Sequence, residues 1–242
     1  MHHALLITFA GIVAGAIAAI SGFGIGSMLT PLLAASLGTK LAVAIVSIPH
    51  CIGTALRFAV IREHVDRHML WSFGITSAAG GLVGALLHLW LRSAVLGYVL
   101  GVLLVFAGVM GLTGLAANLR FGRRTAWIAG ALSGMFGGLV GNQGGIRSAA
   151  LQGFGLQRDA FVATATAIAL LVDVFRMPVY AALQWRQIAA QWPTAAIATI
   201  GVVVGTLSGK WMLQRIPQNV FRIIVASIIL ALGIWMLVHP GA

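Results

Sequence analysis

Six long apolar segments restrict this chain to one class of fold. They lie at residues 41–61, 69–91, 94–118, 160–184, 189–209 and 220–238. Each segment is long enough to cross the apolar core of a bilayer as a helix. Of the 242 residues 60% are hydrophobic and only 8% are charged, too few to cover a soluble domain of this size. The sequence therefore predicts an all-α polytopic membrane protein.

Two further apolar segments, residues 4–38 and 126–157, are interrupted by glycine-rich breaks. The first break is Ser21–Pro31 and the second is Gly134–Arg147. Glycines let backbones approach closely and leave peptide groups unpaired, which a membrane tolerates only inside protein or around a cavity. Each segment is too long for one crossing. It forms either two crossings or a re-entrant pair of half-helices that enters and leaves on the same side.

The distribution of basic residues favours the re-entrant arrangement. With re-entrant segments, Lys40, Arg92 and Arg186 lie on one side and nine loop cations lie on the other. The nine are Arg62, Arg67, Arg120, Arg123, Arg124, Arg158, Lys210, Arg215 and Arg222. With double crossings the same residues divide six against six. Because cytoplasmic loops carry an excess of Lys and Arg, the first arrangement is expected, with both termini periplasmic in a bacterial inner membrane.

The two glycine breaks belong to an internal repeat. A shift of 119 residues superimposes Gly22 on Gly141, Gly26 on Gly145 and Arg57 on Arg176. A small drift then aligns Gly84 with Gly205 and Gly108 with Gly233. A re-entrant pair plus three spanning helices gives an odd number of crossings, so the halves are expected to be inverted repeats. We predict repeats at 1–122 and 123–242 in one membrane domain, joined by the basic turn 118–124.

The breaks also carry a family resemblance. The first contains Gly22-Phe-Gly-Ile-Gly26 followed by Pro31, and the second contains Ser133-Gly-Met-Phe-Gly-Gly-Leu-Val-Gly-Asn-Gln-Gly-Gly145. With the duplicated layout and the length, these motifs make the chain similar to the sulfite exporter TauE/SafE family of membrane permeases. The resemblance covers essentially the whole chain. It implies transport of a small sulfur-containing anion such as sulfite, sulfoacetate or another sulfonate.

The breaks are expected to bind that anion at the membrane midplane. Half-helices that start after Gly26 and after Gly145 would point free N–H groups, which carry partial positive charge, at the centre. Side chains nearby could donate further hydrogen bonds. The predicted substrate-binding residues are Ser21, Gly22, Gly24, Gly26, Ser27, His50, Gly141, Asn142, Gln143, Gly144, Gly145, Arg147 and Arg176. The alternative is that the glycines only pack helices, as expected at Gly80/Gly84, Gly97/Gly101 and Gly201/Gly205.

Several charged side chains at membrane depth each allow two interpretations. Arg147 either binds an oxyanion or reaches an interface or a nearby carbonyl. Asp173 and Arg176 share a helix face, so they form an internal salt bridge or line the pathway, with Asp173 exchanging a proton. Arg57 is expected to extend its head group to the membrane surface. His50 either bonds a neighbouring carbonyl or serves in proton coupling and anion contact.

Other residue groups exclude functions. His64 and His68 flank Glu63 and Asp66, but their place at an interface predicts a solvated turn and not a metal site. The Gly-Asn-Gln-Gly-Gly run lacks the Lys-Ser/Thr of an ATP phosphate loop, so no cofactor is expected and a gradient must drive transport. The net charge of +11 comes from short loops that face lipid headgroups, which excludes a nucleic-acid partner.

These observations predict a secondary transporter and not an enzyme. Expected partners are the anion, membrane lipid, protons as coupling ion and a second copy of the chain in a homo-oligomer. Three alternatives stay open. The first is an anion channel built on the same site. The second is an intramembrane hydrolase that uses Ser21 or Ser27 with His50. The third is a purely structural subunit.

Overall fold

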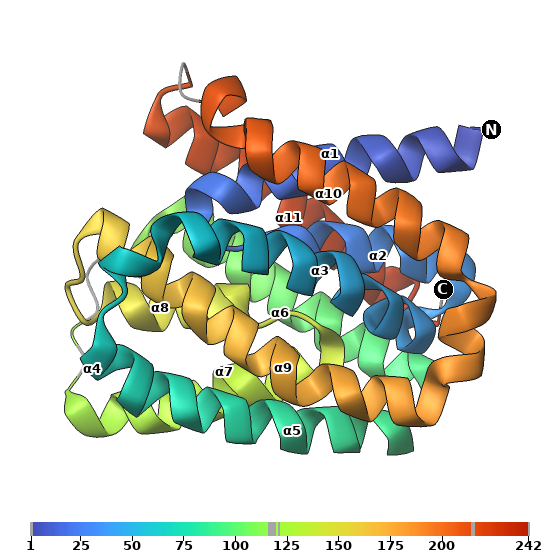
Figure 1. The fold of residues 1–242 in the computed structure, drawn as a ribbon, viewed down its shortest axis with the longest axis horizontal. Helices are drawn as coiled ribbons and strands as arrows, with labels where there is room; N and C mark the ends of the chain where they lie inside the picture. Colours follow the sequence, from blue (N-terminus) through green and yellow to red (C-terminus); the bar gives the residue numbers. More distant parts are fainter. Residues whose placement is uncertain (1, 116–119, 121, 214–215, 242) are drawn as a thin grey trace.

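The computed structural model describes residues 2–115, 120, 122–213 and 216–241, and over these residues it contains helices and turns but no strand (Figure 1). The α-helices are α1 (His2–Ser21), α2 (Ile25–Leu37), α3 (Thr39–Ile61), α4 (Arg67–Met69), α5 (Ile75–Trp90), α6 (Ser93–Thr113), α7 (Arg123–Val140), α8 (Gly144–Gln152), α9 (Arg158–Ala190), α10 (Trp192–Leu213) and α11 (Gln218–Val238). A π-helical turn, Leu70–Gly74, joins α4 to α5. The all-α prediction is confirmed.

Seven helical stretches in the described part of the chain are long and apolar enough to cross a membrane. Six of them contain most of the six predicted spans, and the seventh is Ala4–Ser21 in α1. Three predictions reach outside the described residues. They are the end of the span 94–118, the loop cation Arg215, and residues 118, 119 and 121 of the linking turn. These spans confirm an integral membrane protein.

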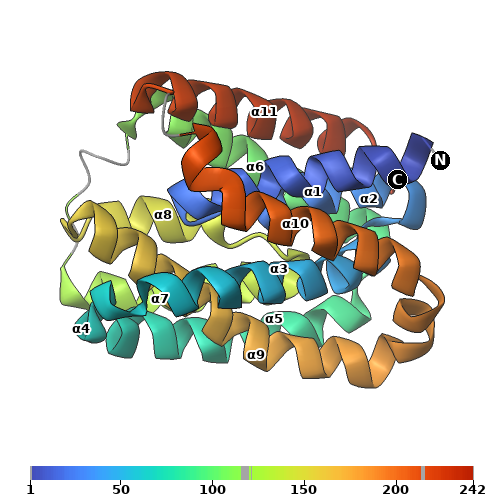
Figure 2. The same ribbon diagram turned by 45° about the horizontal axis from the view of Figure 1, so that its top comes forward.

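Each broken segment returns to the end of the molecule at which it starts. Figures 1 and 2 show α1 running inward from the end that holds both termini, and α2 running back toward that end. They show α7 and α8 doing the same from the opposite end. This is the path that the re-entrant interpretation requires. Both half-helices begin earlier than predicted, because α2 and α8 include Gly26 and Gly145 instead of following them.

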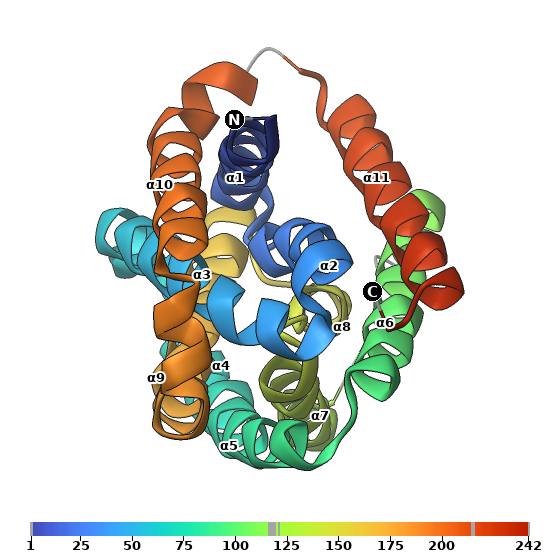
Figure 3. The ribbon, with the colours of Figure 1, turned by 90° about the vertical axis from the view of Figure 1, so that its right-hand side faces the viewer.

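Helix pairs connect the two halves of the chain in a reciprocal pattern. Helix α1 packs on α10 and α7 packs on α5, while α6 packs on α11 and α3 packs on α9. In the end view of Figure 3, the α5–α7 pair and the α1–α10 pair lie on opposite sides of α2 and α8. In chain order, the counterparts of α1, α3, α5 and α6 in the other half are α7, α9, α10 and α11. Exchanging each helix for its counterpart reproduces the same pairs.

Glycines form the contact surfaces of these pairs. A Cβ atom at Gly80 would overlap the carbonyl oxygen of Ala131, and one at Gly205 would overlap that of Ile12. A Cβ at Gly101 would lie 2.8 Å from the Leu237 side chain. The packing interpretation of the later glycine pairs is therefore confirmed, since side chains would hold these helices apart.

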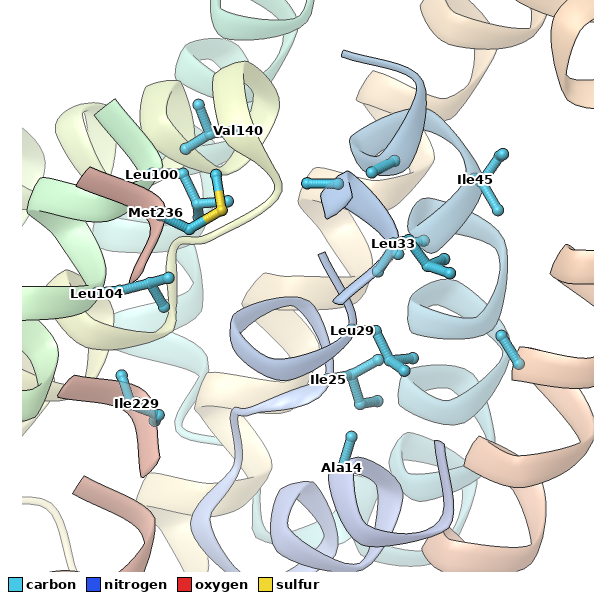
Figure 4. Packing of buried hydrophobic residues seen from close by; sticks show 14 of the residues in the cluster. Ala14, Ile25, Leu29, Leu33, Ile45, Leu100, Leu104, Val140, Ile229 and Met236 are labelled. Carbon is cyan, nitrogen blue, oxygen red and sulfur yellow. The ribbon is translucent and has the colours of Figure 1, made fainter. Parts of the chain in front are cut away.

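The short helix α2 lies inside the bundle and not on its surface. Its Leu29 and Leu33 are fully buried, and Figure 4 shows them with Ile25 beside Ile45 of α3. A second group in the same cluster, which includes Leu100, joins α6, α7 and α11. A helix that is apolar on all sides is typical of a buried position. The protein shell around α2 is what permits a chain break at membrane depth.

Candidate functional site

The two glycine breaks meet at the centre of the molecule. A Cβ atom at Gly26 would overlap the carbonyl oxygen of Gly141, and one at Gly144 would lie 2.6 Å from the Cβ of Phe23. Gly24 and Gly141 have φ angles of 131° and 71°, which disfavour any residue with a side chain. Glycine is therefore required both for the turns and for the contact between them.

Helices α2 and α8 both begin at this contact. Their first residues follow Gly24 and Gln143, and neither helix has a side-chain hydrogen bond that caps its N-terminus. The first intrahelical bonds are donated by Met28 N to Gly24 O, 3.1 Å, and by Arg147 N to Gln143 O, 2.9 Å. The N–H groups of the preceding turn have no intrahelical acceptor, and each helix end carries about half a positive charge.

A small cavity, the central cavity, lies between these helix ends. Its volume is about 10 Å³, roughly the room that one water molecule needs. Its lining residues are Phe23, Gly24, Gly26, Ser27, His50, Gly141, Asn142, Gln143, Gly144 and Arg147. All except Phe23 are residues that the sequence analysis selected. A bound oxyanion would require the walls to move outward.

Hydrogen-bond donors outnumber acceptors among the side chains of the central cavity. Arg147 is 1% exposed, and its one hydrogen bond runs from Nη2 to Gly22 O at 3.4 Å. Its Nε and Nη1 have no partner, and neither do Asn142 Nδ2 and Gln143 Nε2, against one unpartnered acceptor, Gln143 Oε1. Ser27 donates to Asn142 Oδ1 at 3.2 Å, which holds the amide in place. No carboxylate lines the cavity. Its polar lining is suited to an anion.

An ion-pair cluster lies beside the central cavity. His50 Nδ1 lies 2.6 Å from Asp173 Oδ2, and Arg176 Nε donates to Asp173 Oδ1 at 2.8 Å. Asp173 is 0% exposed and does not line the cavity. The predicted salt bridge is thus confirmed. The expectation that His50 bonds a neighbouring carbonyl is wrong, because Asp173, 123 positions later in the chain, takes its Nδ1.

Two arginines donate hydrogen bonds to the C-terminal turns of α1 and α7 in the same way. Arg57 Nη1 donates to Ala18 O at 2.5 Å, and Arg176 Nη1 donates to Gly137 O at 2.9 Å. Donors and acceptors are both related by the shift of 119 residues. Each guanidinium therefore places positive charge at the negative end of a helix dipole. The prediction that Arg57 reaches the membrane surface is wrong, since the residue is 6% exposed and also bonds Thr166.

Several predicted site residues lie outside the central cavity. Ser21 Oγ donates to Ile17 O and Phe23 O, which closes the first break locally. Gly22 donates its N–H to Ala18 O, and its carbonyl oxygen accepts from Arg57 and Arg147. Gly145 packs against Ala107, and Arg176 makes the bonds described above.

The serines of the first break are not positioned as nucleophiles. Ser27 and His50 do line one cavity, and Asp173 bonds His50. A serine nucleophile needs its hydroxyl to donate to the histidine, whereas the Ser27 hydroxyl donates to Asn142 and that of Ser21 to backbone carbonyls. This arrangement does not activate either hydroxyl.

The acidic and histidine-containing turn after α3 is exposed, as predicted. Asp66 Oδ1 accepts from Met69 N at 2.9 Å and begins α4, so the carboxylate serves as a helix cap. His64 and His68 are exposed. Among the described residues, no group of three or more His, Cys, Asp or Glu side chains could hold a metal ion.

Two buried residues near the second break were missed by the sequence analysis. His88 is 0% exposed, and its Nδ1 donates to Leu139 O at 2.7 Å. Its ring centroid lies 5.0 Å from that of Tyr180, whose hydroxyl donates to Gly138 O. The available signal was a histidine four residues after Gly84, on the face by which α5 packs against α7.

Comparison with known proteins places the chain in a family. Neither a curated protein nor a solved structure matches the chain. The model of the family described as Sulfite exporter TauE/SafE matches residues 7–236, nearly the whole chain. With its membrane-spanning helices, the chain therefore belongs to the sulfite exporter TauE/SafE family of membrane transporters for sulfur-containing anions.

Proposed function

We propose that the protein is a secondary transporter that moves a small organosulfur oxyanion, such as sulfite or a sulfonate, and holds it in the central cavity. One observation carries the proposal: two uncapped half-helix N-termini and the buried Arg147 converge on one cavity without a carboxylate. A buried cation without a counter-charge is costly, about 2.5–3.5 kcal/mol at the centre of a membrane helix on the insertion scale. An oxyanion removes that cost when it binds.

The donors suit an anion with several oxygens. Arg147 has free N–H groups on Nε and Nη1, and the amides of Asn142 and Gln143 add more from the same break. The start of α2 contributes backbone N–H groups from the other break. A pyramidal or tetrahedral oxyanion can accept from both sides at once, whereas a planar carboxylate has fewer oxygens to share between them.

The proposed mechanism is alternating access by two inverted repeats, 1–122 and 123–242. The reciprocal helix pairs and the matched arginine caps support this arrangement. In transporters of this design one repeat moves against the other around a site at the midplane. The small volume of the central cavity corresponds to a closed site, which opens when that movement separates the breaks.

The proposed orientation places the termini in the periplasm of a bacterial inner membrane. The turns at the opposite end of the molecule carry most of the described basic residues, among them Arg62, Arg67 and Arg158. An anion leaving the cytoplasm moves with the usual membrane potential, which contributes about 2.3 kcal/mol per charge per 100 mV. Export then needs no coupling ion. Uptake would need one, and His50 with Asp173 is the pair that could exchange a proton.

Proteoliposomes test the proposal. Liposomes that contain the purified protein should release entrapped sulfite or sulfoacetate faster than protein-free liposomes. Thermal-shift screening should show stabilisation by sulfite, sulfate, thiosulfate, sulfoacetate or taurine. Arg147→Gln should greatly weaken both signals, whereas Arg92→Gln, in a loop, should retain them. Stabilisation by carboxylates alone would overturn the sulfur assignment. Unitary conductance far above carrier turnover would instead identify the anion channel.

A further inference from the structure

A second and larger cavity lies at the end of the molecule opposite the termini. This cavity, the vestibule, holds about 690 Å³ and is lined by the ends of α1, α3 and α10 and the starts of α9 and α11, including Ala19, Ile20, Ile61 and Val162. The turns at this end carry the basic residues described above.

One turn of the chain separates the vestibule from the central cavity. Ile20 lines the vestibule and Phe23 lines the central cavity. Between them, a Cβ at Gly22 would lie 3.7 Å from the Cα of Val162, a vestibule residue, while the Gly22 carbonyl accepts from Arg147, a central-cavity residue. The wall is therefore the break of the first re-entrant segment, closed by the Ser21 hydroxyl.

Side chains from α5 and α9 bond to the end of α7, directly before Gly141 of the central cavity. Three consecutive carbonyl groups at the end of α7 each accept a hydrogen bond: Gly137 from Arg176, Gly138 from Tyr180 and Leu139 from His88. His88 and Tyr180 are 0% and 1% exposed and their rings are in contact.

The internal repeat relates the open side to the closed side residue by residue. The shift of 119 places Ala19 and Ile20 on Gly138 and Leu139, and it places Ile61 on Tyr180. The drift that aligns Gly84 with Gly205 places Gly209 on His88. The aligned pairs therefore have Ile61 in place of Tyr180 and Gly209 in place of His88. Ala19, Ile20 and Ile61 all line the vestibule.

We propose that His88 and Tyr180 form the gate on the side of the termini, and that the anion reaches the central cavity through the vestibule and past the Ser21–Phe23 turn. Opening toward the termini then requires the bonds to Gly138 and Leu139 to break. The positions that the repeat relates to His88 and Tyr180 carry no such polar side chain, and the vestibule lies at the positions that correspond to the end of α7. The identity of the anion rests on the proposed function, but the gate is testable without it.

Paired cysteine reporters test the two sides. Ile20→Cys and Leu139→Cys, which are related by the repeat, are each placed in a Cys51→Ser background and treated with a membrane-impermeant maleimide from either side. We expect Ile20→Cys to react from the side opposite the termini and Leu139→Cys to react slowly from both sides. Reaction of Leu139→Cys from the side of the termini as fast as that of Ile20→Cys from the opposite side would overturn the proposal.

Removal of the gate bonds should expose the second reporter. Adding Tyr180→Phe to Leu139→Cys should raise its labelling rate from the side of the termini about fivefold, since one hydrogen bond that favours the closed state is lost. Adding His88→Ala as well should raise it further. Tyr98→Phe removes the same hydroxyl from an exposed ring of α6 and should change nothing. An unchanged rate in the Tyr180→Phe variant contradicts the gate.

A second measurement covers the case in which Leu139→Cys does not assemble. Hydrogen exchange of peptides covering residues 135–145 is compared between Tyr180→Phe and Tyr98→Phe in the otherwise unchanged chain. The proposal expects faster exchange only in Tyr180→Phe, and equal exchange contradicts it. Both readouts report on the gate even if the protein transports no sulfur anion, so failure of the gate and failure of the proposed function are distinguishable.

Discussion

The two broken segments have the same scaffold but contribute different chemistry to the central cavity. In both, an arginine from the following long helix donates to the carbonyl four residues before the glycine that starts the break. In both, a short helix begins at the centre without a side-chain cap. The first break then offers mainly backbone, whereas the second offers the side chains of Asn142, Gln143 and Arg147.

The repeat shows where the halves have diverged. Arg147 corresponds to Met28, Asn142 to Phe23 and Asp173 to Thr54. The glycines and arginines that hold the breaks recur, whereas the polar side chains of Asn142, Arg147 and Asp173 do not. In the proposed alternating-access mechanism both halves move around one site, so the scaffold has to match, but a single asymmetric ligand needs only one charged side. The following substitutions separate scaffold from chemistry.

The largest effect is expected at the ion-pair cluster. Asp173→Asn leaves Arg176 and His50 without their common partner, and breaking a buried pair in this way costs about 3–5 kcal/mol of unfolding free energy. The counterpart Thr54→Val removes a hydroxyl that has no partner and should cost less than 1 kcal/mol. Denaturation in detergent measures both. Normal transport by Asp173→Asn at every pH would exclude a role for Asp173 in proton exchange.

A large effect on binding is expected at Arg147. Arg147→Gln should weaken anion binding by about 2–3 kcal/mol, roughly 30-fold to 150-fold, because hydrogen bonds to charged groups contribute this much. Its counterpart Met28→Leu should bind normally. Titrated thermal shifts measure the affinity. Equal losses in the two variants would mean that Arg147 supports the scaffold and does not contact the anion.

Glycine substitutions should separate contact from packing. Gly26→Ala would push against the Gly141 carbonyl, and its counterpart Gly145→Ala would push against Ala107. Both should lower stability by about 1–3 kcal/mol, since overpacking costs this much. Only Gly26→Ala should also slow transport, because Gly26 lines the central cavity and Gly145 does not. Transport rates compared at equal amounts of folded protein decide this.

The smallest effect is expected at Ser27. Ser27→Ala removes the bond that holds Asn142 and should weaken anion binding by about 0.5–1.5 kcal/mol. Ser36→Ala, which removes a local bond to Leu33 O on α2, should leave binding unchanged. If instead Ser27→Ala abolished a chemical product and not transport, the hydrolase interpretation would replace this one.

Much of the architecture could be predicted because membrane proteins follow few rules along the chain. Hydropathy places the spans, and the glycine clusters place the breaks. Most lining residues of the central cavity could also be predicted, since they lie in the two breaks. Ser21 and Gly145 lie in the same motifs but outside the cavity, because motif membership does not fix which face of a helix a residue occupies. Phe23 was missed since an aromatic residue in an apolar segment gives no signal of its own.

The sequence by itself determined the class of fold, the two breaks and the correspondence of Arg57 to Arg176 in the repeat. These depend on hydropathy, on glycine content and on a repeat that is visible along the chain. Only the tertiary structure decided that His50 meets Asp173, that Gly26 touches Gly141 and that His88 closes the end of α7. Each of these contacts joins residues more than 50 positions apart. Their partners are set by where helices cross, and packing of the whole bundle fixes those crossings.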